Sequence, residues 1–227
     1  MKHPVLFFNL LAVACIALLA ACTSEEYDTG DGEYSYLRAD FAEVHPDANK
    51  NLRAAMTDDG DSLVLDTPLA CSWVTKADTV YRALLYYSRE FGSGQRVRGI
   101  SALQVMLLPP SRLKEGVRMY TDPVVVESSW LSANGKYLNL GMYVKTGKGP
   151  NDKSHHTVGV VRDTVLTLDD GTKEHHLRLF HNKNDMPEYY SSRFYASIPL
   201  AVFAKGDRVR MEANTYDGAF VKTFEVK

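Results

Sequence analysis

Apolar and polar side chains alternate along most of the chain after residue 33, and the spacing of amphipathic helices is nearly absent. A period of two is typical of β-strands that bury one face. The segment from Tyr137 to Lys145 is the clearest example, because apolar side chains occupy every second position. These are Leu138, Leu140, Met142 and Val144. The pattern predicts an all-β protein.

Turn-forming residues divide the first half of the chain into short predicted strands. These strands are Tyr34 to Val44, Ser62 to Leu65, Thr79 to Ser88 and Gly99 to Leu107. The third is apolar on both faces, which favours a central position in its sheet. Pro109-Pro110 ends the series, because proline cannot donate a hydrogen bond to a neighbouring strand. About five strands in about 75 residues fit a small barrel, which we place at residues 34–110.

The second half predicts a longer series of strands. They are Pro123 towards Trp130, Tyr137 to Lys145, His155 to Val161, Asp163 to Leu168, His175 to Phe180, Phe194 to Leu200, Arg208 to Tyr216 and Ala219 to Val226. Asn134-Gly135 is a strong hairpin signal, and Asp169-Asp170-Gly171 predicts another tight turn. This series of strands separated by turns indicates an antiparallel β-sandwich at residues 122–227. Residues 111–121 are the predicted linker, in which one helical turn would fit.

The start of the chain has the pattern of a secretion signal. A short basic start precedes an apolar run that ends in Leu19-Ala20-Ala21-Cys22, a segment that resembles the bacterial lipobox. The resemblance implies a lipoprotein signal peptide at residues 1–21, cleavage before Cys22 and lipidation of its sulfur by diacylglycerol, with palmitate among the acyl chains. An ordinary signal peptide with a chance cysteine is the alternative.

Residues 22–33 are polar and rich in Gly and Asp, which indicates a lipidated flexible tether. Glu25 and Glu26 lie just after Cys22, and this acidic cluster resembles the surface-export signal of Bacteroidota lipoproteins. We therefore expect an outer-membrane protein anchored by lipid and exposed at the cell surface. A plain solvated tether on a protein that faces the periplasm is the alternative.

Composition and charge exclude several classes of protein. The chain is 45% hydrophobic and 24% charged, which argues against collagen, coiled coil and general disorder. The net charge is −2, so the chain lacks the basic footprint of a nucleic-acid-binding protein. Of the three cysteines, only Cys71 follows the lipobox. It cannot form an intramolecular disulfide in the processed chain, and we interpret it as a packing residue rather than a thiol nucleophile.

No catalytic motif is present that would indicate an enzyme: the chain lacks a nucleophile elbow, a P-loop, a dinucleotide fingerprint and a zinc-protease helix. Histidines form one cluster worth weighing: His155, His156, His175, His176 and His181. Imidazoles from neighbouring strands are zinc ligands in many sites. Adjacent histidines in a strand, however, point to opposite faces. We expect half-exposed strand histidines, with no metal, no cofactor and no catalytic residue.

The polar segment from His181 to Tyr190 lies between two strong strands, and loops of this composition often carry binding. Its candidate ligand-contact residues are His181, Asn182, Asp185, Tyr189 and Tyr190. Exposed tyrosines stack on sugars or on other rings. A solvated connection whose rings serve only in packing is the alternative.

Several motifs, taken in order, resemble the NigD-like lipoproteins of Bacteroidota. They are Asp122-Pro123-Val124 leading to Trp130, Tyr137-Leu138-Asn139-Leu140, the stretch from Leu177 to Asn182 with Asp185, the stretch from Tyr195 to Leu200, and Tyr216 in the last strands. Residues 32–65 resemble the same family less specifically. The resemblance implies an OB-like barrel followed by a β-sandwich. It also implies a link to bacteriocin production or immunity, and it supplies no catalytic residues.

These observations favour a lipid-anchored envelope protein that binds a protein, peptide or glycan ligand and does not catalyse a reaction. Immunity to a bacteriocin is a special case of this role. An accessory lipoprotein that binds oligosaccharides is one alternative, because OB-type barrels bind such ligands. A hydrolase whose site is assembled from distant residues is the other. We expect attachment to the membrane through the lipid and no nucleic-acid partner.

Overall fold

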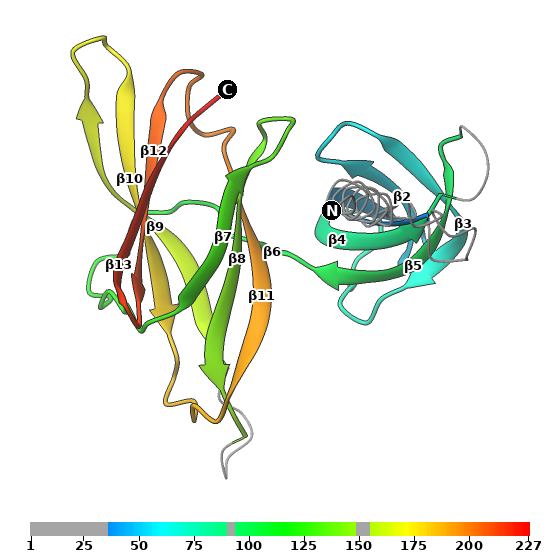
Figure 1. Ribbon diagram of the computed structural model, residues 1–227, viewed down its shortest axis with the longest axis horizontal. Coiled ribbons are helices and arrows are strands. Elements are labelled where there is room, and N and C mark those ends of the chain that lie inside the picture. Colours follow the sequence, from blue (N-terminus) through cyan, green and yellow to red (C-terminus); the bar gives the residue numbers. More distant parts are fainter. Residues whose placement is uncertain (1–35, 90–93, 149–154) are drawn as a thin grey trace, which may run out of the picture. The chain divides into compact units, whose positions relative to one another are not determined.

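The computed structural model describes residues 36–89, 94–148 and 155–227 (Figure 1). The predicted signal peptide and tether, with Cys22, Glu25 and Glu26, lie outside these residues. From Arg38 to Lys227 the chain forms one compact unit. The described part of the chain is built from strands and contains no helix. It accordingly offers no helix of the length and hydropathy needed to span a membrane.

The first five strands close into a barrel, which confirms the predicted OB-like architecture. They are β1 (Leu37–Pro46), β2 (Asn51–Thr57), β3 (Ser62–Ala70), β4 (Tyr81–Ser88) and β5 (Arg96–Gln104). The barrel order is β1-β2-β3-β5-β4. Strands β3 and β5 pair in parallel, at Val64 with Arg96 and at Leu65 with Val97.

Apolar side chains at alternate strand positions fill the barrel interior. In β3, Leu63 and Leu65 are buried whereas Val64 is exposed. Strand β4 is buried on both faces, as its sequence predicts. The barrel core contains Ala42, Val44, Leu52, Ala55, Leu63, Leu65, Val74, Ala83, Leu85, Tyr87 and Val97. Inside this core, the side chain of Tyr87 donates a hydrogen bond to Asp40 Oδ2 at 2.7 Å.

Two four-stranded sheets follow the barrel and form the β-sandwich. One sheet has the order β13-β12-β10-β9, and the other has the order β6-β11-β8-β7. Their strands are β6 (Met106–Leu107), β7 (Val125–Leu131), β8 (Tyr137–Thr146), β9 (Thr157–Thr167), β10 (Lys173–Asn182), β11 (Tyr190–Pro199), β12 (Arg208–Thr215) and β13 (Gly218–Glu225). The pairing is antiparallel except between β10 and β12 and between β6 and β11.

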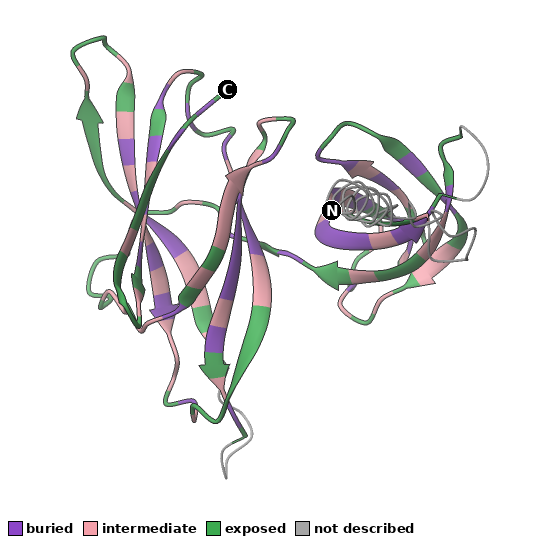
Figure 2. Ribbon diagram, viewed as in Figure 1, coloured by how far each residue is buried: buried purple, intermediate pink, exposed green. Residues whose placement is uncertain are grey.

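The sandwich core lies between the two sheets. Every predicted inward residue of β8 is buried, from Leu138 at 0% exposed to Val144 at 6%. Further core residues include Val160, Leu177, Leu179, Ile198, Val209, Met211 and Phe224. Buried positions concentrate in the middle of these strands, whereas the far end of the β9–β10 hairpin is exposed (Figure 2). That end therefore extends beyond the apolar core.

Three details differ from the expected pattern. Strand β2 was not predicted, because Ala54 and Ala55 have low β-propensity; pairing with both β1 and β3 imposes the strand. The two strands expected on either side of Arg162 are one continuous strand, β9. The predicted linker contains no helical turn. Instead, Ser111 and Thr121 form isolated bridges with Val161 and His181. The proposed domain boundaries remain a prediction.

A buried polar network joins strands of the barrel and of the sandwich within the compact unit. Arg82 of β4 is 4% exposed and forms a bidentate ion pair with Asp58, at 2.8 and 3.0 Å. Asn139 of β8 donates to Asp58 Oδ2 at 3.1 Å, and Ser197 of β11 donates to Asn139 Oδ1 at 2.7 Å. The Arg82 guanidinium also lies 4.0 Å from the ring centroid of Tyr137. Each buried charge in this network therefore has a partner.

Candidate functional site

The candidate contact residues of the His181–Tyr190 segment fall into two groups. His181 and Asn182 end strand β10, and the His181 side chain is buried, so it offers no surface for a ligand. Asp185 lies in the loop in the left-handed region, with φ of 58°, which Asp tolerates better than most residues. Tyr189 and Tyr190 are 77% and 56% exposed. The structure thus leaves Asp185 and the two tyrosines available at the surface.

This loop is held by hydrogen bonds at several points. Asp122 Oδ2 accepts from the Lys183 amide at 2.8 Å, and Asn182 Oδ1 accepts from the Asn184 amide at 2.9 Å. The Lys183 ammonium pairs with Glu188 at 2.6 Å. These contacts give the segment a defined path, which fits a structured connection as well as a binding loop.

Two of the five clustered histidines meet. His181 Nδ1 lies 2.9 Å from the carbonyl oxygen of Asp122, which can only accept, so His181 donates from Nδ1. Its Nε2 then accepts from His156 Nδ1, also at 2.9 Å. Burial lowers the pKa of His156, and the nearby His181 lowers it further. The pair is a short hydrogen-bonded chain of two imidazoles.

The adjacent histidines of β10 point to opposite faces, as the strand period predicts. His176 faces Glu174, with Nε2 to Oε1 at 2.7 Å. His175 is buried and its Nε2 lies 2.9 Å from Asp207 Oδ2. Among the residues that the structure describes, no group of three or more His, Cys, Asp or Glu is placed to hold a metal ion.

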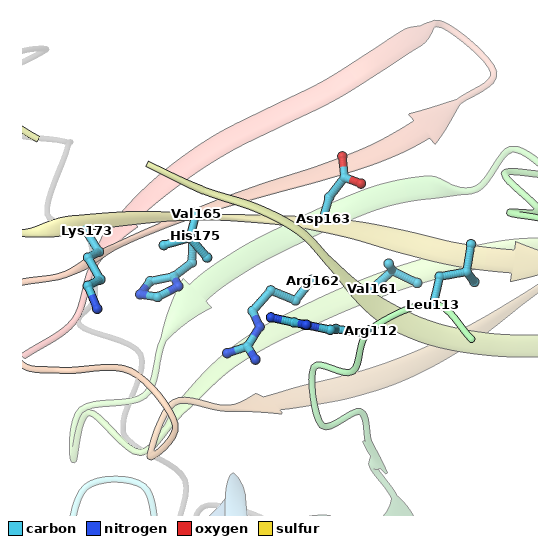
Figure 3. Close-up of a pocket in the computed structure, with 8 residues that line it drawn as sticks. All are labelled: Arg112, Leu113, Val161, Arg162, Asp163, Val165, Lys173 and His175. Carbon is cyan, nitrogen blue, oxygen red and sulfur yellow. The ribbon is translucent and has the colours of Figure 1, made fainter. Parts of the chain in front are cut away.

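An open groove of about 720 Å³ lies beside the exposed end of the β9–β10 hairpin (Figure 3). Its lining consists of Arg112, Leu113, Val161, Arg162, Asp163, Val165, Lys173 and His175. Three segments contribute: the segment after the barrel, strand β9 and strand β10. We call this site the basic groove, because three of its side chains are cations.

Backbone pairing places the cations of the basic groove. Ser111 donates to the Val160 carbonyl at 3.0 Å and accepts from the Arg162 amide at 2.8 Å. Arg112 therefore lies beside the edge of β9. A register shift opposite His176 and Leu177 leaves Asp163 as an extra residue in β9 and puts Arg162 opposite Leu177. Because Leu177 belongs to the core, Arg162 faces the inner side of the sheet.

Little negative charge compensates these cations. Asp163 lines the groove, but its carboxylate pairs with Arg178 at 3.1 Å and extends away from Arg112 and Arg162 (Figure 3). Within the described residues, no carboxylate forms an ion pair with Arg112, Arg162 or Lys173. The groove is therefore a local concentration of positive charge on a chain whose net charge is −2.

His175 lies at the base of this charge cluster. Asp207 accepts hydrogen bonds from its Nε2 and from the backbone amides of Lys173 and Ala204. The hydrogen bond from His175 holds the pKa of the Asp207 carboxyl below its usual range. The other ring nitrogen, Nδ1, is buried and has no hydrogen-bond partner. It is therefore a buried polar atom that the described part of the protein leaves unsatisfied.

Sequence reasoning missed the basic groove. Arg112, Arg162 and Lys173 are far apart in the sequence and belong to no motif. One signal was present: the alternation breaks at Arg162-Asp163, which we interpreted as a gap between strands. A break of this kind inside a strand also marks a β-bulge, and bulges often re-aim side chains at functional sites.

A second, smaller groove of about 360 Å³ lies on the barrel. Leu69, Cys71, Trp73, Ile100 and Leu103 are among its lining residues. Trp73 is half-buried and its Nε1 donates to the Ala102 carbonyl at 3.3 Å. Cys71 is half-buried, and burial raises the pKa of its thiol. A raised pKa disfavours the reactive thiolate, in line with a packing role.

Residues 109–227, more than half of the chain, match the model of the NigD-like C-terminal β-sandwich domain. Solved structures are similar over most of the chain. A NigD-like immunity protein from Bacteroides caccae is 20% identical, with a TM-score of 0.65 over 84% of this chain and 97% of that one. A candidate toxin-related protein from Parabacteroides distasonis is 21% identical, with a TM-score of 0.60 over 83% and 92% of the two chains.

A candidate lipoprotein from Bacteroides fragilis is 12% identical, with a TM-score of 0.58 over 84% of this chain and 98% of that one. At these identities the likeness establishes the fold, and a shared fold does not establish a shared function. No curated protein matches the chain.

Proposed function

Because the chain belongs to the NigD-like family, as its match over residues 109–227 indicates, we propose that it is a lipid-anchored, non-catalytic binding protein of the bacterial envelope. The basic groove carries this proposal, because it gathers three cations without paired carboxylates and stays open to solvent. Its lining contains no serine, threonine or cysteine that could act as a nucleophile.

Anchoring is assigned to Cys22. The lipobox before it supports lipidation, and firm attachment requires more than one acyl chain. Labelling cells with radioactive palmitate tests this assignment. The wild-type chain should incorporate label in the membrane fraction, and Cys22→Ser should not. Equal labelling of both forms would overturn the anchor.

Exposure at the cell surface is the proposed orientation, with Glu25 and Glu26 as its export signal. Protease treatment of intact cells tests it, followed by immunoblotting of the protein and of a periplasmic control. Surface exposure predicts loss of the protein while the control stays intact. Replacing both glutamates by alanine should restore protection. Full protection of the wild type would instead support a periplasm-facing protein.

Immunity to a bacteriocin is the specific form of this role that we propose to test first. A structurally similar chain from Bacteroides caccae is named as a NigD-like immunity protein. Deletion of the gene should increase sensitivity to at least one bacteriocin from related strains, and expression in trans should reverse the effect. Unchanged sensitivity across such a panel would argue against immunity and leave binding as the role.

Glycan capture is a second candidate, favoured by the barrel groove. Trp73, Ile100 and Leu103 present apolar surface there, and OB-type barrels bind oligosaccharides. A glycan array with the wild type and with Ile100→Asp tests it. Binding that the substitution removes would support this function, and an array without signal above background would contradict it.

A further inference from the structure

The structure assigns a specific ligand class to the basic groove: we propose that it binds a phosphate monoester through Arg112, Arg162, Lys173 and His175. This inference deepens the proposed binding function and rests on it. Four features of the groove support it: the convergence of the cations, the lack of compensating charge, the unpartnered ring nitrogen and the apolar wall.

The cations come from separate segments of the chain and line one groove. The guanidinium groups of Arg112 and Arg162 lie next to each other in the view of Figure 3, and Lys173 lies beyond His175 at the end of the groove. Like charges held together repel, and the repulsion grows as solvent is excluded. An anion between them removes this cost. Guanidinium forks match the oxygens of phosphate in pairs, which makes arginine the favoured residue for this ligand.

The charge balance favours a dianion over a simple carboxylate. Three cations face the groove, whereas Asp163 is engaged by Arg178 and Asp207 by His175. A phosphate monoester carries between one and a half and two negative charges, roughly, near neutral pH and offers three acceptor oxygens. It can therefore accept hydrogen bonds from two arginines and one further donor at the same time.

Lys173 can supply that further donor, and His175 lines the groove beside it. Asp207 fixes Nε2 as the nitrogen that carries hydrogen in the neutral ring. Nδ1 is then a buried atom without a hydrogen-bond partner in the protein. A ligand group that forms a hydrogen bond with this nitrogen would remove the free-energy cost of burying it unsatisfied.

The wall of the groove indicates an ester rather than free phosphate. Leu113, Val161 and Val165 line it next to the cations. A volume of about 720 Å³ is also far larger than one phosphate group fills, and lies in the range of sites for small organic ligands. A sugar phosphate and the headgroup of a phosphomonoester lipid share the required chemistry.

Isothermal titration calorimetry on the purified full chain in detergent tests the proposal. The probes are glucose 1-phosphate, inorganic phosphate, glucose as a neutral control and phosphatidic acid in micelles of the same detergent. We expect glucose 1-phosphate or phosphatidic acid to bind more tightly than inorganic phosphate, and glucose not to bind. Preference for the sugar phosphate identifies a soluble ligand, and preference for phosphatidic acid identifies a lipid headgroup. Either result supports a monoester.

Variants connect binding to the groove. Arg112→Gln and Arg162→Gln should each weaken binding by about tenfold to a hundredfold, the effect of losing a charge-assisted hydrogen bond. Arg193→Gln is the matched control. Arg193 lies on the exposed part of β11, away from the groove, and pairs with Glu127 of β7. The substitution should leave affinity unchanged. Thermal melting verifies that each variant is folded.

The absence of binding by every phosphate probe would overturn the proposal, as would binding that survives Arg112→Gln and Arg162→Gln. These failures are separable from failure of the proposed function, because palmitate labelling of Cys22 and the bacteriocin test do not depend on phosphate. A binding protein with a different ligand would still pass both of those tests.

Discussion

The Nε2 atom of His175 lies 2.9 Å from Oδ2 of Asp207, and both side chains are only 8% exposed. The contact joins the start of strand β10 to the loop that precedes β12. It also determines which nitrogen of His175 faces outward from the pair, and so prepares the floor of the basic groove. One interaction thus serves both the stability of the sandwich and the chemistry of its candidate site.

Acid should destabilise the protein in part through Asp207. The hydrogen bond from His175 and those from two backbone amides keep the pKa of this carboxyl below its ordinary value of 3.8. The unfolded chain therefore binds the proton first as the pH falls, and the stabilisation is lost as the pH drops below about 4 through the lowered pKa. Urea midpoints measured from pH 3 to pH 7 should decrease less steeply in this range for Asp207→Asn. Parallel curves for the two proteins would contradict this role.

Two arginine–aspartate pairs of the barrel should contribute very differently. Arg82 is buried with Asp58, whereas Arg89 and Asp61 are 44% and 53% exposed in their side chains. Arg82→Met should reduce the free energy of unfolding by about 3–5 kcal/mol, because it leaves a buried carboxylate unpaired. Arg89→Met, the matched control, should cost about 1 kcal/mol or less. Guanidinium denaturation measures both, and equal effects would refute the importance of the network.

Truncation in the sandwich core should be costly at Ile198, which is fully buried in β11. Ile198→Ala should reduce the free energy of unfolding by about 2–5 kcal/mol, since it creates a cavity as well as removing apolar contact. Val221→Ala serves as the control, because Val221 is 44% exposed on β13 and surface changes usually stay within about 0.5 kcal/mol. If chemical denaturation gave both variants similar midpoints, the assignment of this core would be wrong.

His156 should resist protonation. Burial and the neighbouring His181 lower its pKa from the ordinary 6.5, so the unfolded chain takes up this proton before the folded chain does. Stability should therefore fall as the pH decreases through 6.5. A titration of the imidazole carbon-bound protons by NMR should give His156 a midpoint below 6.5. His181→Phe should raise that midpoint towards the ordinary value, and a wild-type midpoint above 6.5 would contradict the expected effect of burial on His156.

The sandwich strands could be predicted well, because burial on one face leaves a period of two in the sequence. Leu138, Leu140 and Met142 follow it without a break. Strand β2 escaped prediction because pairing on both sides, rather than the propensities of Ala54 and Ala55, makes it a strand. The hydrophobic pattern of a segment indicates which of its faces is buried. It does not indicate which strands will pair with that segment.

The polar residues inside the sandwich motifs have a clear physical role. Asn139 lies between two core leucines and Ser197 between Ala196 and Ile198, so both face the other side of their sheet. There they join the network around Arg82. Their sequence pattern indicated the alternation but not the partner, because Arg82 is more than fifty residues away in the chain.

The candidate site was only partly predictable for the same reason. The loop tyrosines are exposed, as a binding loop requires, whereas His181 turned inward to the backbone of Asp122. Arg112, Arg162 and Lys173 converge through strand pairing and a bulge. A single sequence contains no spacing rule for such a set.

The most direct test of a non-catalytic groove that binds phosphate monoesters is ³¹P NMR of glucose 1-phosphate with the full chain. We predict that the ester resonance shifts or broadens when protein is added, and that it returns unchanged when the protein is removed. At the same protein concentration, Arg162→Gln should perturb the resonance less than the wild type does. A signal of free inorganic phosphate that grows with time would contradict the non-catalytic role. Unperturbed resonances of both glucose 1-phosphate and phosphatidic acid with the wild type would contradict the ligand class.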